Sequence, residues 1–215
     1  IFGLRGLMPS SEQEEYIKIR LDKANQLIAK GINPYPSKFE KSHTNSEAIE
    51  KFLELEMSDN SDNMAPVTLA GRVVARRTMG KATFIDISDS TGRLQIMMRQ
   101  NNLAEKYELL DQLDIGDWIG ATGIIFRTRT KEITQQVDSF EIICKALRPL
   151  PEKWHGLTDI ETRFRQKYLD LIANEKSVSN VLIRSKLIKS IRDFMEEKGF
   201  IEVETPILTR STPEG

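Results

Sequence analysis

Phe84 and Gln95 carry side chains suited to binding a nucleic-acid base, and both fall in segments with β-strand alternation. In residues 82–88, alternation places the isoleucines on one side and Phe84 on the other, beside water. In residues 93–99, it leaves Gln95 facing outward near Phe84 if the two segments form a hairpin. A ring stacks on a base, and an amide offers a donor and an acceptor to a base edge. These segments predict a surface for single-stranded bases; a ring packed beneath a helix is the competing interpretation.

The composition narrows the classes of protein to consider. The chain has 39% hydrophobic and 29% charged residues and a net charge of −1, so any RNA contact has to come from local clusters. The single Cys144 excludes an internal disulfide framework, and with His43 and His155 it cannot form a zinc-type cluster. No run approaches the roughly 18 apolar residues of a membrane span, so we expect no membrane partner. The single cysteine fits a reducing cytoplasm best, and this is the location that we expect.

The segments around Phe84 belong to a predicted series of five strands. A short helix at residues 102–113 separates the third strand from the fourth. Three strands, a helix and two strands are the order of an OB-fold Greek-key barrel, which binds oligonucleotides on strands two and three and on the flanking loops. The strands are predicted at residues 67–77, 82–88, 93–99, 118–129 and 132–145.

Charged side chains border the two loops that flank this face. Arg77 and Lys81 border the first loop, in a local basic cluster that also contains Arg72 and Arg76, and Arg127, Arg129 and Glu132 border the second. Taken singly, each is better explained as solvated surface. Together with the aromatic ring they favour a binding function, because they converge from separate places in the sequence.

The fold class is therefore mainly β with α, and three domains are predicted: an N-terminal extension (residues 1–63), the barrel (64–150) and a mostly helical part (151–215). Amphipathic spacing and end signals predict the helices, and a polar run at residues 58–63 and a proline-rich hinge at 147–151 separate the parts. The helices are predicted at residues 12–30, 46–56, 159–172 and 177–198, followed by a strand at 201–204 that ends at Pro206.

Three strings resemble a known family: "AGRVVARRTMGKATFIDISDSTGRLQI", "KALRPLPEKWHGLTDIETRFRQKYLDLI" and "GFIEVETPIL". They are similar to the anticodon-binding domain, the interdomain connector and the first signature motif of a class II lysyl-tRNA synthetase. The resemblance covers nearly everything from residue 11 to residue 208. It implies an OB-fold domain followed by the helical start of an α+β catalytic domain.

The resemblance also implies roles for individual residues. Phe84 matches the ring that stacks on an anticodon base, and Arg77, Gln95 and Glu132 match the polar set that recognises the central uridine. Arg77 can donate, Glu132 can accept and Gln95 can do either. Arg76, Lys81, Arg127 and Arg129 remain candidates for contacts with the RNA backbone.

The family ligates lysine to tRNA-Lys with ATP and Mg²⁺ and works as a homodimer, so the resemblance implies these partners for the full-length enzyme and places Pro206 at the dimer interface. The sequence stops at Gly215, before anything like the second and third motifs that hold ATP. We therefore expect this chain to carry no catalytic residue, metal ligand or cofactor of its own, and to be inactive in aminoacylation when alone.

The last residues, "TRSTPEG", look more like the aspartyl relative, in which this segment lies at the amino-acid pocket. Glu214 and Gly215 are accordingly candidates for the edge of that pocket, with a plain exposed loop as the alternative. Other interpretations also stay open: an aspartyl-type relative or a chimera, a free-standing module that binds single strands, or a scaffold in which Phe84 anchors a protein partner.

Overall fold

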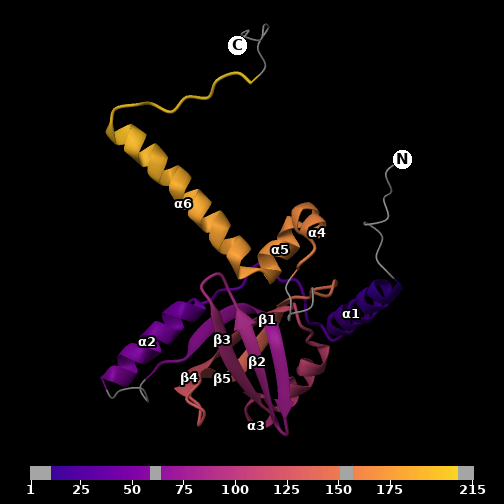
Figure 1. Cartoon of the computed structure of the whole chain (residues 1–215). Helices are drawn as coiled ribbons and strands as arrows, with labels where there is room; N and C mark the ends of the chain where they lie inside the picture. The colour runs from indigo at the N-terminus through magenta and orange to yellow at the C-terminus, as the bar shows by residue number, and fades with distance from the viewer. Residues whose placement is uncertain (1–10, 59–63, 151–156, 208–215) are drawn as a thin grey trace. The chain divides into compact units, whose positions relative to one another are not determined.

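The computed structural model describes residues 11–58, 64–150 and 157–207, and its first part is built around a closed five-stranded barrel (Figure 1). The strands are hydrogen-bonded in the order β1-β2-β3-β5-β4, and β4 returns to pair with β1. The β3–β5 pair is parallel and the other pairs are antiparallel. The predicted OB-fold arrangement is confirmed. The strands are β1 (Val67–Met79), β2 (Ala82–Ser88), β3 (Arg93–Arg99), β4 (Trp118–Arg127) and β5 (Ile133–Cys144).

The core of the barrel comes from the inward side of the alternating strands. Ile85, Ile87 and Ile96 are fully buried there. Burial of one such side chain stabilises the fold by about 1.5–3 kcal/mol relative to exposure. Strands β2 and β3 have the bounds predicted from the sequence, because alternation begins and ends sharply in both segments.

Between β3 and β4, α3 (Gln100–Leu103) is followed by the 3₁₀ helix η3 (Ala104–Gln112). Ala104 has a φ of 47°, a conformation that an α-helix cannot contain, so the predicted single helix is divided at this residue. Leu103 and Leu110 nevertheless reach the core at 4% and 1% exposure. The connection therefore still supplies core residues to the barrel.

Helices α1 (Ser11–Ala29) and α2 (Asn45–Met57) lie on opposite flanks of the barrel in Figure 1. A capping box starts α2: the Thr44 hydroxyl accepts from the Glu47 backbone N–H, and the Glu47 carboxylate accepts from the Thr44 N–H. Phe52 of α2 and Leu27 of α1 are buried in the core cluster. Both predicted N-terminal helices are thus present and packed.

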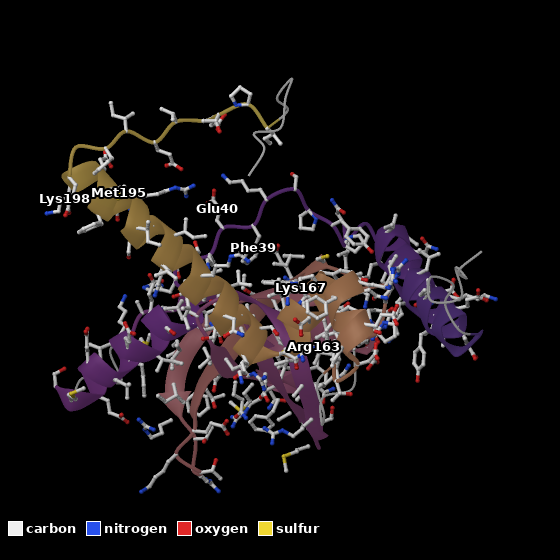
Figure 2. All side chains as sticks on the ribbon, turned by 45° about the horizontal axis from the view of Figure 1, so that its top comes forward. Phe39, Glu40, Arg163, Lys167, Met195 and Lys198 are labelled. Carbon is white, nitrogen blue, oxygen red and sulfur yellow. The ribbon has the colours of Figure 1, made fainter. Side chains whose placement is uncertain are left out.

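The segment of residues 33–44, which we call the cover segment, runs along the outer face formed by β1 and β4. Phe39, labelled in Figure 2, packs on Gly120 of β4, where a Cβ would lie 2.0 Å from the ring. Further along, the Ser42 N–H donates to the Thr68 carbonyl at 2.8 Å, and the Thr68 N–H donates to the Ser42 hydroxyl at 2.9 Å. Glycine at position 120 therefore makes room for an aromatic ring on the strand.

A buried charge cluster fixes α1 to the end of the barrel. Lys145 Nζ, fully buried, lies 2.5 Å from Asp117 Oδ2 and 2.8 Å from Asp114 Oδ2. Lys23 of α1 lies 2.6 Å from the other Asp114 oxygen. Burial raises the pKa of Asp114, but the hydrogen bonds from Lys145 and Lys23 together lower it by more than burial raises it. The pKa of Asp114 therefore lies below its usual value.

The chain divides into two compact units, residues 1–150 and 151–215. The second contains α4 (Ile160–Arg165), α5 (Lys167–Ala173) and α6 (Glu175–Glu197). The prediction of one helix over 159–172 was wrong, because Gln166 takes a non-helical conformation (φ −117°, ψ 61°).

Buried Asp170 lies at the centre of this second unit. It accepts hydrogen bonds from Lys167 Nζ at 2.5 Å, Asn174 Nδ2 at 2.6 Å and Arg163 Nε at 2.8 Å. These bonds lower its pKa, with the largest effect from Lys167. Arg163 and Lys167 come from α4 and α5 (Figure 2), so the carboxylate ties the two short helices to the start of α6.

The predicted strand at residues 201–204 was also wrong. Residues 201–206 have no regular secondary structure within the described part of the chain, because no neighbouring strand pairs with them there. In α6, Ser177 is the buried residue, whereas the predicted apolar stripe is exposed. Figure 2 marks the far end of this helix with Met195 and Lys198. The exposed stripe comprises Val178, Val181, Leu182, Ile188, Ile191 and Met195.

Candidate nucleic-acid interface

A β-bulge in β1 determines which arginine faces outward from the barrel. The pairing of β1 with β2 leaves Val74 without an opposite residue. One extra residue moves every following side chain to the other face of the strand. As a result, Arg77 lies opposite Phe84 on the outer face. Arg76 lies opposite Ile85, which belongs to the core.

Arg76 contacts the connection between β3 and β4. Its Nη1 donates to the carbonyl of Leu110 at 2.7 Å and to that of Leu113 at 3.1 Å. Asp111 lies 3.9 Å from Nη2. These bonds satisfy carbonyls at the end of η3, so Arg76 has a clear structural role. Its contact with an RNA backbone remains a prediction.

Phe84 lies at the middle of the outer face, between Arg77 of β1 and Met97 of β3 in the strand register. The ring is half-buried, and the Arg77 side chain beside it is 62% exposed. Arg77 Nη2 lies 3.9 Å from Asp86 Oδ1, a distance at which the two charges attract without a close hydrogen bond. An exposed guanidinium and a partly exposed ring therefore lie side by side.

The prediction that Gln95 faces solvent was wrong. Gln95 is 7% exposed, and it pairs with Asp86 rather than with Phe84. Its amide Nε2 donates to Glu132 Oε2 at 3.1 Å, and its Oε1 accepts from the Thr134 hydroxyl at 3.0 Å. Because β3 lies between β2 and β5, its outward amide is enclosed by side chains from both sides.

Glu132 lies at the end of the β4–β5 hairpin and is exposed. The hairpin holds its backbone: the Thr128 N–H donates to the Glu132 carbonyl at 2.9 Å, and the Glu132 N–H donates to the Thr128 hydroxyl at 3.0 Å. The carboxylate also accepts the hydrogen bond from Gln95. The structure thus brings Glu132 and Gln95 together on the face that also carries Phe84.

The remaining basic candidates divide into two kinds. Arg127 donates through Nε to Glu56 Oε1 at 2.7 Å and through Nη1 to the Lys131 carbonyl at 2.8 Å, and its guanidinium lies 5.9 Å from the Phe52 ring. Arg127 therefore fastens α2 to the hairpin. Lys81 and Arg129 are exposed, and neither side chain has a hydrogen bond or ion pair within the described residues. Among the predicted candidates for backbone contacts, those two side chains are without a partner in the described part of the chain.

Sequence reasoning missed Thr134, which is fully buried and bonded to Gln95. A signal was present: in a strand that starts near residue 132, alternation puts Glu132 and Thr134 on one face. Asp86 was missed as the charged neighbour of Arg77, although alternation places it beside Phe84.

The other predicted site residues lie in the second unit. Pro206 is exposed in the extended segment after α6, and Glu214 and Gly215 lie outside the described residues. Over residues 11–58, 64–150 and 157–207, no group of three or more His, Cys, Asp or Glu side chains could hold a metal ion. None of the helices in this part of the chain is long and apolar enough to cross a membrane.

Comparison with known families matches two stretches of the chain. Residues 67–148 match the family described as OB-fold nucleic acid binding domain. Residues 159–215 match the family described as tRNA synthetases class II (D, K and N). The first stretch contains the barrel with the face around Phe84, and the second begins at the N-cap of α4.

Individual relatives extend the similarity along nearly the whole chain. It is 48% identical over 202 residues to a lysine–tRNA ligase of Carboxydothermus hydrogenoformans, covering 94% of this chain and 40% of that relative. A lysine–tRNA ligase of Pelotomaculum thermopropionicum is 47% identical over 210 residues, covering 95% and 40%. One of Shouchella clausii is 43% identical over 213 residues, covering 99% and 42%. The chain therefore spans about 40% of the length of these curated relatives.

Proposed function

We propose, on the premise that this chain belongs to the class II lysyl-tRNA synthetase family, that its barrel binds a tRNA anticodon on the face around Phe84. One observation carries the proposal. Arg77 and Phe84 are paired in register on the outer face, and Glu132 joins this face from the neighbouring hairpin. The face thus combines a stacking surface, a donor and an acceptor, which are what recognition of an unpaired base requires.

The chemistry fits a uridine at the central anticodon position. Phe84 stacks on a base, which is worth about 1–3 kcal/mol. A uracil edge has carbonyl acceptors and one imino donor, so Arg77 donates to a carbonyl and Glu132 accepts from the imino group. Lys81 and Arg129 contact phosphates. Gln95, with both ends of its amide hydrogen-bonded, acts through Glu132 rather than on the base directly.

For the whole protein we propose the family reaction, ligation of lysine to tRNA-Lys with ATP and Mg²⁺, in the cytoplasm and as a homodimer. The exposed apolar stripe of α6 and the following segment with Pro206 support the dimer, because such a stripe favours burial against a partner. Among the described residues, no group of three or more His, Cys, Asp or Glu side chains could hold Mg²⁺. For this part of the chain we propose RNA binding and dimerisation. Glu214 and Gly215 remain candidates for the edge of the amino-acid pocket.

The test is a binding titration with anticodon stem-loops carrying UUU, GUC, or a cytidine in place of the central uridine, at fixed salt. We expect UUU to bind tightest and Phe84→Ala to remove most of the affinity. Thr122→Val, which alters a strand on the covered side of the barrel, serves as the control and leaves binding unchanged.

Other outcomes would identify the competing functions. Equal binding of UUU and GUC keeps recognition of the central uridine but favours the aspartyl-type relative. Indifference to the central base, with binding retained, overturns the proposal in favour of a general single-strand module. Absence of RNA binding leaves the scaffold in which Phe84 anchors a protein.

A further inference from the structure

A chain of three polar side chains runs along the outer face of the barrel, from Thr134 of β5 through Gln95 of β3 to Glu132. Thr134 is fully buried, Gln95 is 7% exposed, and Glu132 is exposed. The Thr134 hydroxyl lies 3.0 Å from Gln95 Oε1, and Gln95 Nε2 lies 3.1 Å from Glu132 Oε2. Gln95 and Thr134 are also direct partners in the parallel register of β3 and β5, so the backbone holds the first link.

The chemistry of the groups fixes the direction of this chain. A carboxylate can only accept hydrogen bonds, so Gln95 has to turn its NH₂ group toward Glu132. Its carbonyl oxygen then points at Thr134, whose hydroxyl is able to donate. The reversed amide would place two acceptors together at Glu132, at a cost of more than the lost bond. The hydroxyl also lies 3.4 Å from the Glu132 carbonyl, but the contact with Gln95 is the shorter one.

We propose that Thr134 is a positioning residue that makes the barrel selective for a base with an imino N–H at the central anticodon position. The inference rests on the proposed function. By holding Gln95 in one orientation, Thr134 fixes the Glu132 carboxylate, which already has one oxygen bound to Gln95. The other oxygen is then presented to the base as an acceptor. Uracil offers a donor at that point, whereas cytosine has an unprotonated ring nitrogen and is repelled.

The test compares Thr134→Val with Thr134→Ser by measuring dissociation constants for stem-loops that carry uridine, cytidine or 3-methyluridine at the centre. 3-Methyluridine keeps both carbonyls and lacks the imino hydrogen. Valine has the shape of threonine without the donor, and serine restores the donor. Thr122→Val is the matched control, because it removes a similar hydroxyl contact, 2.9 Å from Thr68, on the covered side of the barrel.

We expect Thr134→Val to lower the preference for uridine over both other bases by about three- to tenfold, the equivalent of one hydrogen bond. Thr134→Ser and Thr122→Val keep the preference of the wild type. Loss of stability alone would change affinity for all three stem-loops together and would leave their ratio unchanged. If Thr134→Val unfolds, Thr134→Cys, with a weakly donating thiol, takes its place.

Two failures are distinguishable. A wild-type chain that binds the three stem-loops equally contradicts the proposed function itself. A wild-type chain that prefers uridine, together with a Thr134→Val chain that keeps the same ratio, overturns only the role of Thr134.

Discussion

The barrel has two outer faces that the chain treats in opposite ways. On the face of β1 and β4, the cover segment packs Phe39 on Gly120 and bonds Ser42 to Thr68. On the face around β2 and β3, Phe84 remains half-buried, and Arg77, opposite it at the end of β1, has a side chain that is 62% exposed. Both faces carry an aromatic ring. Phe84 belongs to a strand of the barrel, whereas Phe39 belongs to the cover segment and packs onto a strand from outside.

The difference shows how a stable fold can leave one surface free for a ligand. On the covered face, backbone groups of the cover segment bond to the strand, so its contacts add to stability. On the open face, side chains such as Gln95 and Glu132 bond to each other and hold a defined arrangement. We therefore expect substitutions on the covered side to change stability, and those on the open side to change binding.

The largest expected effect is on the free energy of unfolding, at the buried charge cluster that fixes α1 to the end of the barrel. Lys145→Met leaves the buried Asp117 carboxylate without its ion-pair partner, and loss of one member of a buried pair costs about 3–5 kcal/mol. Urea unfolding measures this loss. The same substitution at exposed Lys81 is the control and changes the free energy of unfolding by less than about 0.5 kcal/mol. Equal losses of unfolding free energy for Lys145→Met and Lys81→Met would show that the buried ion pair does not stabilise the fold.

A second substitution tests the contact that makes the face covered. Gly120→Ala places a Cβ within the space of the Phe39 ring, so the ring has to move, and we expect a loss of roughly 1–3 kcal/mol. Thermal unfolding measures the loss. The double variant with Phe39→Ala should be less than additive, because the clash is then absent. Additive losses would show that Gly120 and Phe39 do not act together.

Replacing the ring on each face by leucine gives the sharpest contrast between the two faces. Phe84→Leu keeps apolar bulk but removes the stacking surface, so affinity for the UUU stem-loop should fall by about 1–3 kcal/mol with little change in stability. Phe39→Leu, its matched control, should lower the melting temperature and leave affinity unchanged. RNA titration measures the affinity and calorimetry measures the melting temperature. A loss of affinity in Phe39→Leu together with a loss of stability in Phe84→Leu would reverse the assignment of the two faces.

The smallest expected effect is on the pH at which the protein unfolds in acid. The pKa of Asp114 is lowered in the folded state, because the bonds from Lys145 and Lys23 outweigh burial. Its contribution to stability is therefore present above its usual pKa of 3.8 and is lost as the pH falls through the folded value. Lys23→Met removes one of these bonds and should move the acid unfolding midpoint to higher pH. An unchanged midpoint would mean that Lys23 does not stabilise the carboxylate.

The sequence was sufficient for features that depend on local alternation. It predicted the bounds of β2 and β3 and the outward position of Phe84, since each follows from the residues of a single strand. Prediction from the sequence failed for features that depend on the tertiary structure. Gln95 is buried because strands on both sides enclose it, and the backbone leaves the helical conformation at Gln166 (φ −117°, ψ 61°), which the spacing of the apolar residues did not indicate. The roles of Arg77, Phe84, Gln95 and Glu132 in RNA binding stay predictions.

The bulge at Val74 means that the number of residues in β1, and not their identity alone, determines which side chains face outward. The additional residue decides which of the two adjacent arginines after it lies on the open face. Deleting Val74 would give β1 a regular register in which Ala75 follows Val73 opposite Asp86, so Arg76 and Arg77 would keep their faces. An alignment of related barrels should therefore match positions by the face on which they lie, and a gap at Val74 leaves the open face unchanged.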